Sequence, residues 1–160
     1  MARRRAASIM SKMFATAAIC ATLTGAVPAR AALGGDVASI QMDEVRMQGT
    51  RRTIAADAYT VHEIQAASGT VVREYAGADG KVFAVTFHGP YQPDMRQILG
   101  NYFDQYYRAV TAQGTRRGRR PVAINEPGLS VQIAGHLRSF AGRAYVPEML
   151  PSAVRAEDLQ

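Results

Sequence analysis

The chain has 160 residues, of which 19 are Lys or Arg, 13 are Asp or Glu and one is cysteine. Five of the basic residues and none of the acidic ones lie in residues 1–31, so the remainder carries 14 basic against 13 acidic residues, a net charge of +1. A nearly neutral remainder gives no electrostatic reason to expect nucleic-acid binding. Because Cys20 also lies in residues 1–31, the remainder excludes disulfides, thiolate catalysis and thiolate metal sites.

Residues 1–31 are typical of a secretory signal peptide. A basic start is followed by the uncharged, mostly apolar run Met13–Val27 and then by Ala29-Arg30-Ala31, a small-x-small cleavage signal. The run is shorter than the ~20 apolar residues that a membrane-spanning helix needs. Lipidation of Cys20 is a weaker reading, because a lipoprotein signal usually has a small residue where Ile19 stands. We therefore expect an exported bacterial protein, periplasmic or secreted, cut before Ala32, with no transmembrane segment after cleavage.

The first part of the expected mature chain, residues 32–57, reads as a helix and a connector. Asp36 is a candidate N-cap, and apolar residues recur weakly at helical spacing after it, which predicts a helix over Asp36–Met47. Thr50–Asp57 reads as a polar connector.

Three strands are predicted next, over Ala58–Ile64, Thr70–Ala76 and Lys81–His88, since each is rich in aromatic and β-branched residues. Asp79-Gly80 lies between the second and the third. This pair predicts a type I′ hairpin turn with positive φ at both positions. In the last strand, alternation places Phe83, Val85 and Phe87 on one face.

A long amphipathic helix follows Pro93. Asp94 and Gln97 fit a capping box, and the apolar residues from Met95 to Val110 recur at three-and-four spacing. Gly100 lies within this helix, where glycine costs ~1 kcal/mol relative to alanine.

The C-terminal part predicts a basic loop and a hairpin. Gln113–Arg120 is polar and basic, Pro121–Ile124 reads as a short edge strand, and Leu129–Ala134 turns at Gly135-His136 into Leu137–Val146. Residues 152–160 read as a loose tail after the two prolines that end regular structure.

These elements predict an α+β fold in which residues 58–151 form a single domain. Short turns make the three-strand meander and the C-terminal hairpin antiparallel, and one amphipathic helix covers one face of a sheet. We expect the long helix to pack on a four- or five-stranded antiparallel sheet.

Several phrases of the chain resemble an exported bacterial family known as domain of unknown function 2844. The phrases are Ala32-Leu33-Gly34-Gly35, Ser68-Gly69-Thr70-Val71-Val72-Arg73-Glu74-Tyr75, Val82-Phe83 before Gly89-Pro90, Pro93-Asp94, Leu99-Gly100-Asn101-Tyr102-Phe103, Gly135-His136 and Gly142-Arg143-Ala144-Tyr145-Val146-Pro147. Phe87 stands where many members are expected to have Trp. The resemblance implies an exported single-domain protein and supplies no activity, ligand or catalytic residue.

Histidines and carboxylates are the candidates for chemistry. His62 and its neighbour Glu63 point to opposite faces of a strand, although Glu74 or His88 could partner His62 across the sheet. His88 and His136 lie at loop positions, where sites are common. No two histidines have a metal-ligand spacing, so we assign no metal, cofactor or catalytic residue and keep His88, His136 and Glu74 as polar candidates.

Arg116, Arg117, Arg119 and Arg120 form the strongest local charge in the chain. Guanidinium groups bind phosphates and carboxylates in a bidentate manner, which favours an anionic envelope component or a protein partner over nucleic acid. The leading hypothesis is therefore a non-enzymatic binding or accessory protein of the cell envelope. The alternative is a small periplasmic hydrolase or isomerase that uses a His–carboxylate pair.

Overall fold

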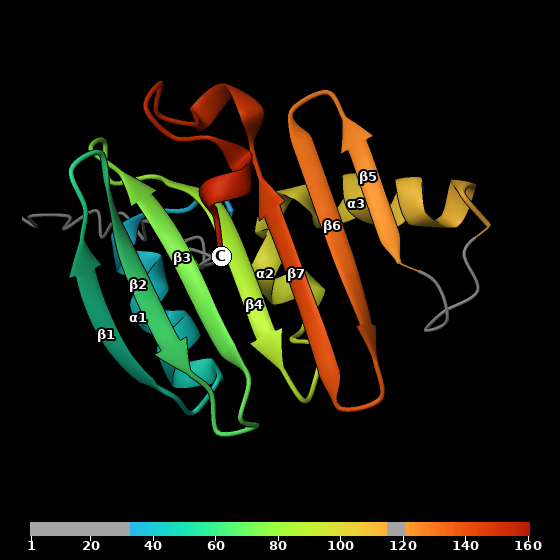
Figure 1. Cartoon of the computed structure of the whole chain (residues 1–160), viewed down its shortest axis with the longest axis horizontal. Helices are drawn as coiled ribbons and strands as arrows, with labels where there is room; N and C mark the ends of the chain where they lie inside the picture. Colours follow the sequence, from blue (N-terminus) through green and yellow to red (C-terminus); the bar gives the residue numbers. More distant parts are fainter. Residues whose placement is uncertain (1–32, 115–120) are drawn as a thin grey trace, which may run out of the picture.

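The computed structural model describes residues 33–114 and 121–160. Its centre is one antiparallel sheet of seven strands in the order β1-β2-β3-β4-β7-β6-β5 (Figure 1). The strands are β1 (Thr50–Ala55), β2 (Tyr59–Gln65), β3 (Val71–Gly77), β4 (Val82–Gly89), β5 (Val122–Glu126), β6 (Leu129–His136) and β7 (Ser139–Tyr145). The helices are α1 (Val37–Arg46), α2 (Met95–Leu99), η1 (Gly100–Tyr102), α3 (Phe103–Ala112), η2 (Pro147–Met149) and η3 (Ala156–Asp158).

Two meanders meet in the middle of this sheet. Strands β1 to β4 pair in chain order, and β5, β6 and β7 do the same. The chain leaves β4 at Gly89, passes through α2 and α3, and returns so that its last strand, β7, pairs with β4. The pairing places Thr86 opposite Arg143 and His88 opposite Ala141. Residues far apart in the sequence therefore share the centre of the sheet.

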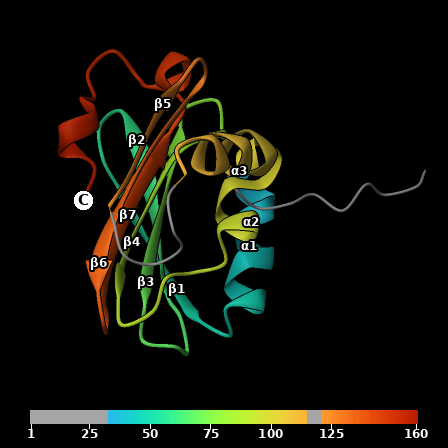
Figure 2. The same ribbon diagram turned by 90° about the vertical axis from the view of Figure 1, so that its right-hand side faces the viewer.

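Helices α1, α2 and α3 cover one face of the sheet, as Figure 2 shows edge-on. Ile40, Ile98 and Leu99 on these helices are almost completely buried, and they share a core cluster with Val85 and Phe87 of β4. The predicted mixed helix-and-strand fold is thereby confirmed. No helix of the described residues is long and apolar enough to cross a membrane.

The predicted N-terminal helix is confirmed. The Asp36 side chain caps α1, its Oδ1 accepting a hydrogen bond from the Ser39 amide at 2.9 Å. The chain ahead of α1 is also fixed, since the Leu33 amide donates to the carbonyl of Ile98 at 3.1 Å. Leu33 itself is only 1% exposed. The start of the domain is thus anchored in the core.

The second predicted helix is interrupted. It divides into α2, the 3-10 turn η1 and α3, with Gly100 at the break in a left-handed conformation at φ 50°. A residue with a side chain rarely adopts this φ, which explains glycine here. The Asp94 cap is confirmed, because its Oδ1 accepts from the Arg96 amide at 2.9 Å. The capping box is wrong: the Gln97 side chain turns to Asp43 in α1 instead.

The expected strand count of four or five was too low. Thr50–Asp57, expected to be a connector, contains the edge strand β1, and the sheet has seven strands. Arg51, Arg52 and Thr53 give this segment no apolar alternation. An edge strand with mostly exposed side chains is held by main-chain pairing to β2, so its composition gives little signal. The strands predicted over Ala58–Ile64, Thr70–Ala76 and Lys81–His88 are confirmed.

Two turns differ from expectation. Of Asp79 and Gly80 only Gly80 has positive φ, and the Gly77 amide bonds to the carbonyl of Lys81 at 2.9 Å, which closes a three-residue hairpin rather than a type I′ turn. At the other hairpin β6 runs on through His136, and the turn falls at Leu137 and Arg138.

Strand β4 also contains a register shift beside Tyr75 and Ala76 of β3. A bulge changes the alternation of side chains along a strand. Phe83 consequently belongs to a second cluster with Tyr75, while Val85 and Phe87 remain under the helices. The expectation that all three share one face was wrong.

The segment after β7 folds back over the opposite face of the sheet (Figures 1 and 2). Leu159 is 4% exposed in the second cluster, beside Val61, Tyr75, Phe83 and Ala84. The expected loose tail over residues 152–160 is therefore wrong at its end. Leu159, the hydrogen bonds of Gln160 and the bond from Arg143 to the Ala156 carbonyl hold this segment to the sheet.

Candidate functional site

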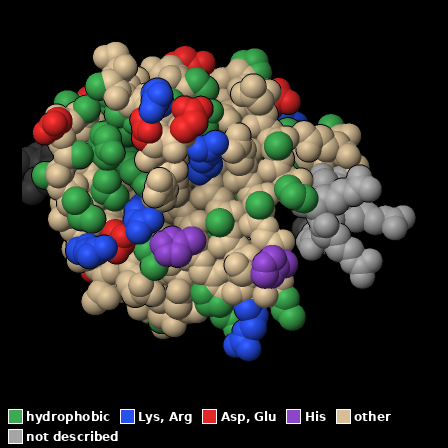
Figure 3. Space-filling view, in the orientation of Figure 1, with side chains coloured by type: hydrophobic (Ala, Val, Ile, Leu, Met, Phe, Trp, Pro, Cys, Tyr) green, Lys and Arg blue, Asp and Glu red, His purple; other side chains and the backbone are tan. Residues whose placement is uncertain are grey.

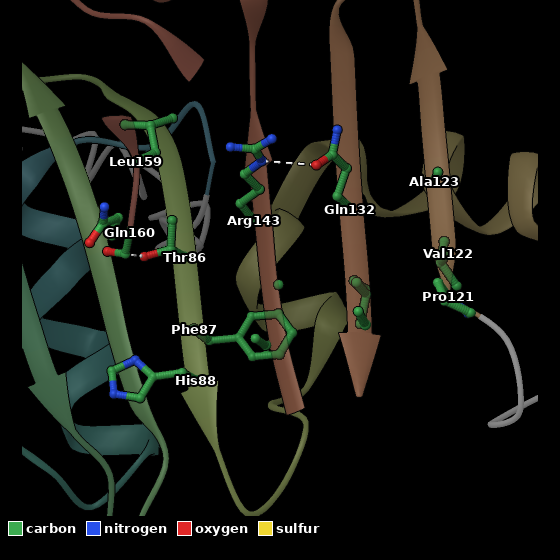
Figure 4. A pocket seen from close by; sticks show the side chains of 14 residues that line it. Thr86, Phe87, His88, Pro121, Val122, Ala123, Gln132, Arg143, Leu159 and Gln160 are labelled. Atoms are coloured by element: carbon green, nitrogen blue, oxygen red, sulfur yellow. Dashed lines mark hydrogen bonds between the residues drawn. The ribbon is translucent and has the colours of Figure 1, made fainter. Parts of the chain in front are cut away.

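The face of the sheet opposite α1, α2 and α3 has a shallow groove of about 480 Å³ beside the C-terminal segment (Figures 3 and 4). It crosses β4, β7, β6 and the start of β5. Its lining residues are Thr86, Phe87, His88, Pro121, Val122, Ala123, Gln132, Ile133, Ala134, Ala141, Gly142, Arg143, Leu159 and Gln160.

Strand pairing and small side chains create the groove. His88, Ala141 and Ala134 stand opposite one another across β4, β7 and β6, and Thr86, Arg143 and Gln132 do so one step further along. Side chains paired in register point to the same face of a sheet. The alanine row leaves a hollow, and the polar row forms its rim.

Gly142 keeps the floor of the groove thin. A Cβ atom at this position would lie 2.5 Å from ring atoms of Phe87, closer than real contacts allow. Phe87 belongs to the helix-side core, and its ring lies beside the β7 backbone (Figure 4). The groove and the core are thus separated by little more than the backbone of β7.

The groove carries a positive charge that its own lining does not neutralise. Arg143 donates from Nε to Oε1 of Gln132 at 3.0 Å and from Nη1 to the carbonyl of Ala156 at 2.8 Å. Both acceptors are neutral, and none of the described lining residues is Asp or Glu. His88 reaches the same groove as an exposed side chain (Figure 4). The arrangement suits a ligand with an anionic group and a flat or apolar body.

A second cluster of candidate groups lies on the helix side, sealed in the core. His62 and Glu74 stand opposite each other on β2 and β3. Asp43 of α1 joins them, its Oδ1 accepting a hydrogen bond from Gln97 at 2.6 Å. Asp43 and Glu74 are 0% exposed, and His62 is 6% exposed.

Burial changes the protonation of these groups. It raises the pKa of Asp43 to about 6, although the hydrogen bond from Gln97 acts in the opposite direction. Burial and the neighbouring Asp43 carboxyl raise the pKa of Glu74 well above its usual range. Burial, assisted by Arg51, lowers the pKa of His62. These directions favour a protonated carboxyl and a neutral imidazole in the core.

The pKa directions of the two carboxyl groups favour one proton shared between them. No donor of the described residues reaches Oδ2 of Asp43 or either oxygen of Glu74, yet the two groups act on each other's pKa. Two unshared charges in the core would be far more costly than one charge with a shared proton. Since no substrate can reach groups this deeply buried, the arrangement is suited to a structural role rather than to catalysis on a substrate.

The three predicted polar candidates lie in different parts of the structure. His88 lines the groove, His136 is exposed at the end of β6, and Glu74 lies in the core. His62 is buried, with Thr53 Oγ1 3.3 Å from its Nδ1. The arginines Arg116, Arg117, Arg119 and Arg120, like the predicted leader, lie outside the described residues.

Sequence reasoning missed Arg143, Gln132 and Asp43. The first two gave no signal on their own, because β4–β7 and β6–β7 pairing brings them to the groove. Asp43 did give one: it follows Ile40 by three positions and precedes Met47 by four, so helical spacing places a carboxylate on the buried stripe.

Comparisons with known proteins place the chain in a family. No curated protein and no solved structure matches it. Residues 29–159, which include every described strand and helix, match a family described as a protein of unknown function, DUF2844. This is the family that the phrases quoted above resemble. The chain therefore belongs to the DUF2844 family.

Proposed function

We propose that this chain is an exported, non-enzymatic binding or accessory protein of the cell envelope, and that the groove on the open sheet face receives an anionic envelope component. The observation that carries the proposal is the guanidinium of Arg143, which lines a groove with no Asp or Glu side chain among its described residues and bonds only to neutral acceptors. The predicted leader supports export, and Arg116, Arg117, Arg119 and Arg120 directly precede Pro121 at the end of the groove. These arginines would add to the attraction for an anion.

The enzymatic alternative has weaker support from the same geometry. A hydrolase or isomerase using a His–carboxylate pair needs both groups within reach of a substrate. His62 and Glu74 face each other but are buried, and His88 shares its groove with no carboxylate among the described residues. An open, shallow groove with a cationic rim is better suited to binding.

The test compares two arginines on the same sheet face. Arg143→Gln removes the unpaired guanidinium, whereas Arg52→Gln removes one that is 67% exposed and paired with Glu63 at 2.7 Å. Both variants lose one positive charge. On immobilised heparin, we expect Arg143→Gln to elute at distinctly lower salt than the wild type, because the charge of Arg143 has no anionic partner in the groove. Arg52→Gln should elute close to the wild type, because the charge of Arg52 is already paired with Glu63. Salt screens exposed charges, so the elution salt measures these contacts.

A third variant with Arg116, Arg117, Arg119 and Arg120 changed to Gln tests the neighbouring cluster. We expect it also to elute early, with an unchanged melting temperature, and vesicles of phosphatidylglycerol should reproduce the order of the variants. If Arg143→Gln and Arg52→Gln reduce retention equally, the groove is not the binding site and only net charge matters.

A further inference from the structure

Three donors converge on one main-chain oxygen at the inner end of the groove. The carbonyl oxygen of Gln160 accepts hydrogen bonds from Arg73 Nη1 at 2.9 Å, from Thr86 Oγ1 at 3.0 Å and from the Tyr75 hydroxyl. The Tyr75 oxygen in turn accepts from the Gln160 amide at 3.2 Å. Tyr75 and Thr86 are each 4% exposed beneath this segment.

This cradle is held in place independently of its occupant. Arg73 Nε bonds to Glu63 Oε2 at 2.7 Å, which fixes the plane of the guanidinium. Tyr75 packs with Tyr59 and Phe83, their ring centroids 5.7 and 6.2 Å from that of Tyr75. A guanidinium and two hydroxyls directed at one oxygen are the donors that a carboxylate requires.

The occupant is held by one buried side chain, by Val154 packed on the same cluster, by the bond from Arg143 to the Ala156 carbonyl and by the bonds of Gln160. From residue 151 to residue 160 only Leu159 is buried, and it lies in the apolar cluster with Val61, Phe83 and Ala84. Arg155 and Asp158 form an exposed ion pair, which contributes little. A segment with one fully buried side chain and no strand pairing opens more readily than the paired strands beneath it.

We infer that Arg73, Tyr75 and Thr86, with the adjoining apolar cup, form a docking site for the C-terminal carboxylate of a partner polypeptide whose preceding residue is leucine-like, and that residues 156–160 occupy this site as a displaceable strap. The inference rests on the proposed function because Leu159 and Gln160 form one wall of the groove and Arg143 bonds to the Ala156 carbonyl. Displacing the strap would lengthen the groove towards β3. The recognition mode is capture of a chain end by convergent donors.

The test uses the full chain with the strap released. Leu159→Asp places a charge where the cup is apolar, so the segment should leave the sheet while the strands stay folded. The probe is a fluorescein-labelled peptide of residues 154–160 (VRAEDLQ), made with a free carboxylate and, as the matched control, with a C-terminal amide. Fluorescence anisotropy measures its binding to each chain.

We expect the carboxylate peptide to bind Leu159→Asp at least tenfold more tightly than wild type, because the tethered strap competes at a high effective concentration in the wild type. The amide should bind at least tenfold more weakly than the acid, and adding Arg73→Gln should abolish that preference. Leu159→Ala serves as the second released chain if Leu159→Asp does not melt cooperatively.

Absence of saturable binding to a released chain that still melts cooperatively would overturn the inference, and so would equal binding of acid and amide. If Arg143→Gln and Arg52→Gln reduce heparin retention equally, the proposal of an anionic groove ligand is rejected. The peptide result does not depend on that outcome. The two proposals therefore fail separately.

Discussion

Asp43 and Glu74 place two carboxyl groups between α1 and β3, where neither is exposed to solvent. A lone buried carboxylate is costly, so the pair is tolerable only with a proton between the two groups and with help from Gln97. Arg46 acts on Asp43 and Arg51 acts on Glu74, each lowering the pKa of the carboxyl, and Arg51 also lowers the pKa of His62. A pair of acids in the core therefore links the packing of α1 to pH.

Replacing Glu74 with Gln should change how stability depends on pH. The folded chain holds protons that the unfolded chain releases near pH 3.8 and 4.5, since folding raises the pKa of both acids. The contribution of the pair is fully present at low pH and is lost as pH rises through the raised pKa values. As pH rises above about 4, Glu74→Gln should lose less stability than wild type, because one of the two raised pKa values is gone. Urea denaturation at each pH measures this.

Glu63→Gln is the matched control because it makes the same chemical change on the neighbouring strand. The hydrogen bond from Arg52 lowers the pKa of Glu63, so its contribution is present above pH 4.5 and is lost as pH falls. The stability of Glu63→Gln should therefore be below that of wild type at neutral pH and approach it as pH falls. Glu74→Gln should show the opposite pH trend. Parallel pH profiles for the two variants would contradict the assignment of a shared proton to the buried pair.

At the scale of elements, the helical layer depends on α2 more than its five residues suggest. Ile98 and Leu99 fill the core under the break at Gly100, and the carbonyl of Ile98 accepts from Leu33. The helix is too short to be stable alone, so its stability comes from this packing.

Leu99→Ala should destabilise the fold by about 2–5 kcal/mol, as other large-to-small core substitutions do. Leu137→Ala is the control, since Leu137 lies in the β6–β7 turn with 87% of its surface exposed and should change stability by less than about 0.5 kcal/mol. Denaturant melts of the two variants give the comparison. Similar losses at both positions would mean that the helix face is wrongly assigned.

The sequence predicts the helices and strands whose buried faces show as regularly spaced apolar residues. Strand β4 and the helix that begins at Asp94 carry apolar residues at the spacing of their buried faces, and both were found. Strand β1 is mainly polar and is held by backbone pairing, so its composition did not indicate a strand. The break at Gly100 depends on a backbone angle, which composition does not indicate either. The groove is harder still: only His88 could be named, because Arg143 and Gln132 reach it through long-range pairing.

For the whole molecule, the consequence of the topology is a sheet covered on one side. The helices bury one face, and the segment after β7 covers only the part of the other face that carries Tyr75, Phe83 and Ala84. The uncovered part has small and polar side chains, which lowers the penalty of leaving it in water. That division leaves the groove open without exposing the main core.

The last prediction concerns where the mature protein begins. Leu33 is buried and bonded to Ile98, and the Gly34 amide bonds to the carbonyl of Val82 at 2.8 Å, so removing either residue would open the core. Cleavage after Ala31 keeps both. When the full chain is produced in a bacterium with a periplasm, the intact mass of periplasmic protein should correspond to a chain that starts at Ala32. Changing Ala29 and Ala31 to Leu should block this cleavage, because the signal requires small residues at both positions. A periplasmic product that retains Met1, or that carries lipid on Cys20, would contradict the assignment of residues 1–31 as a cleaved leader.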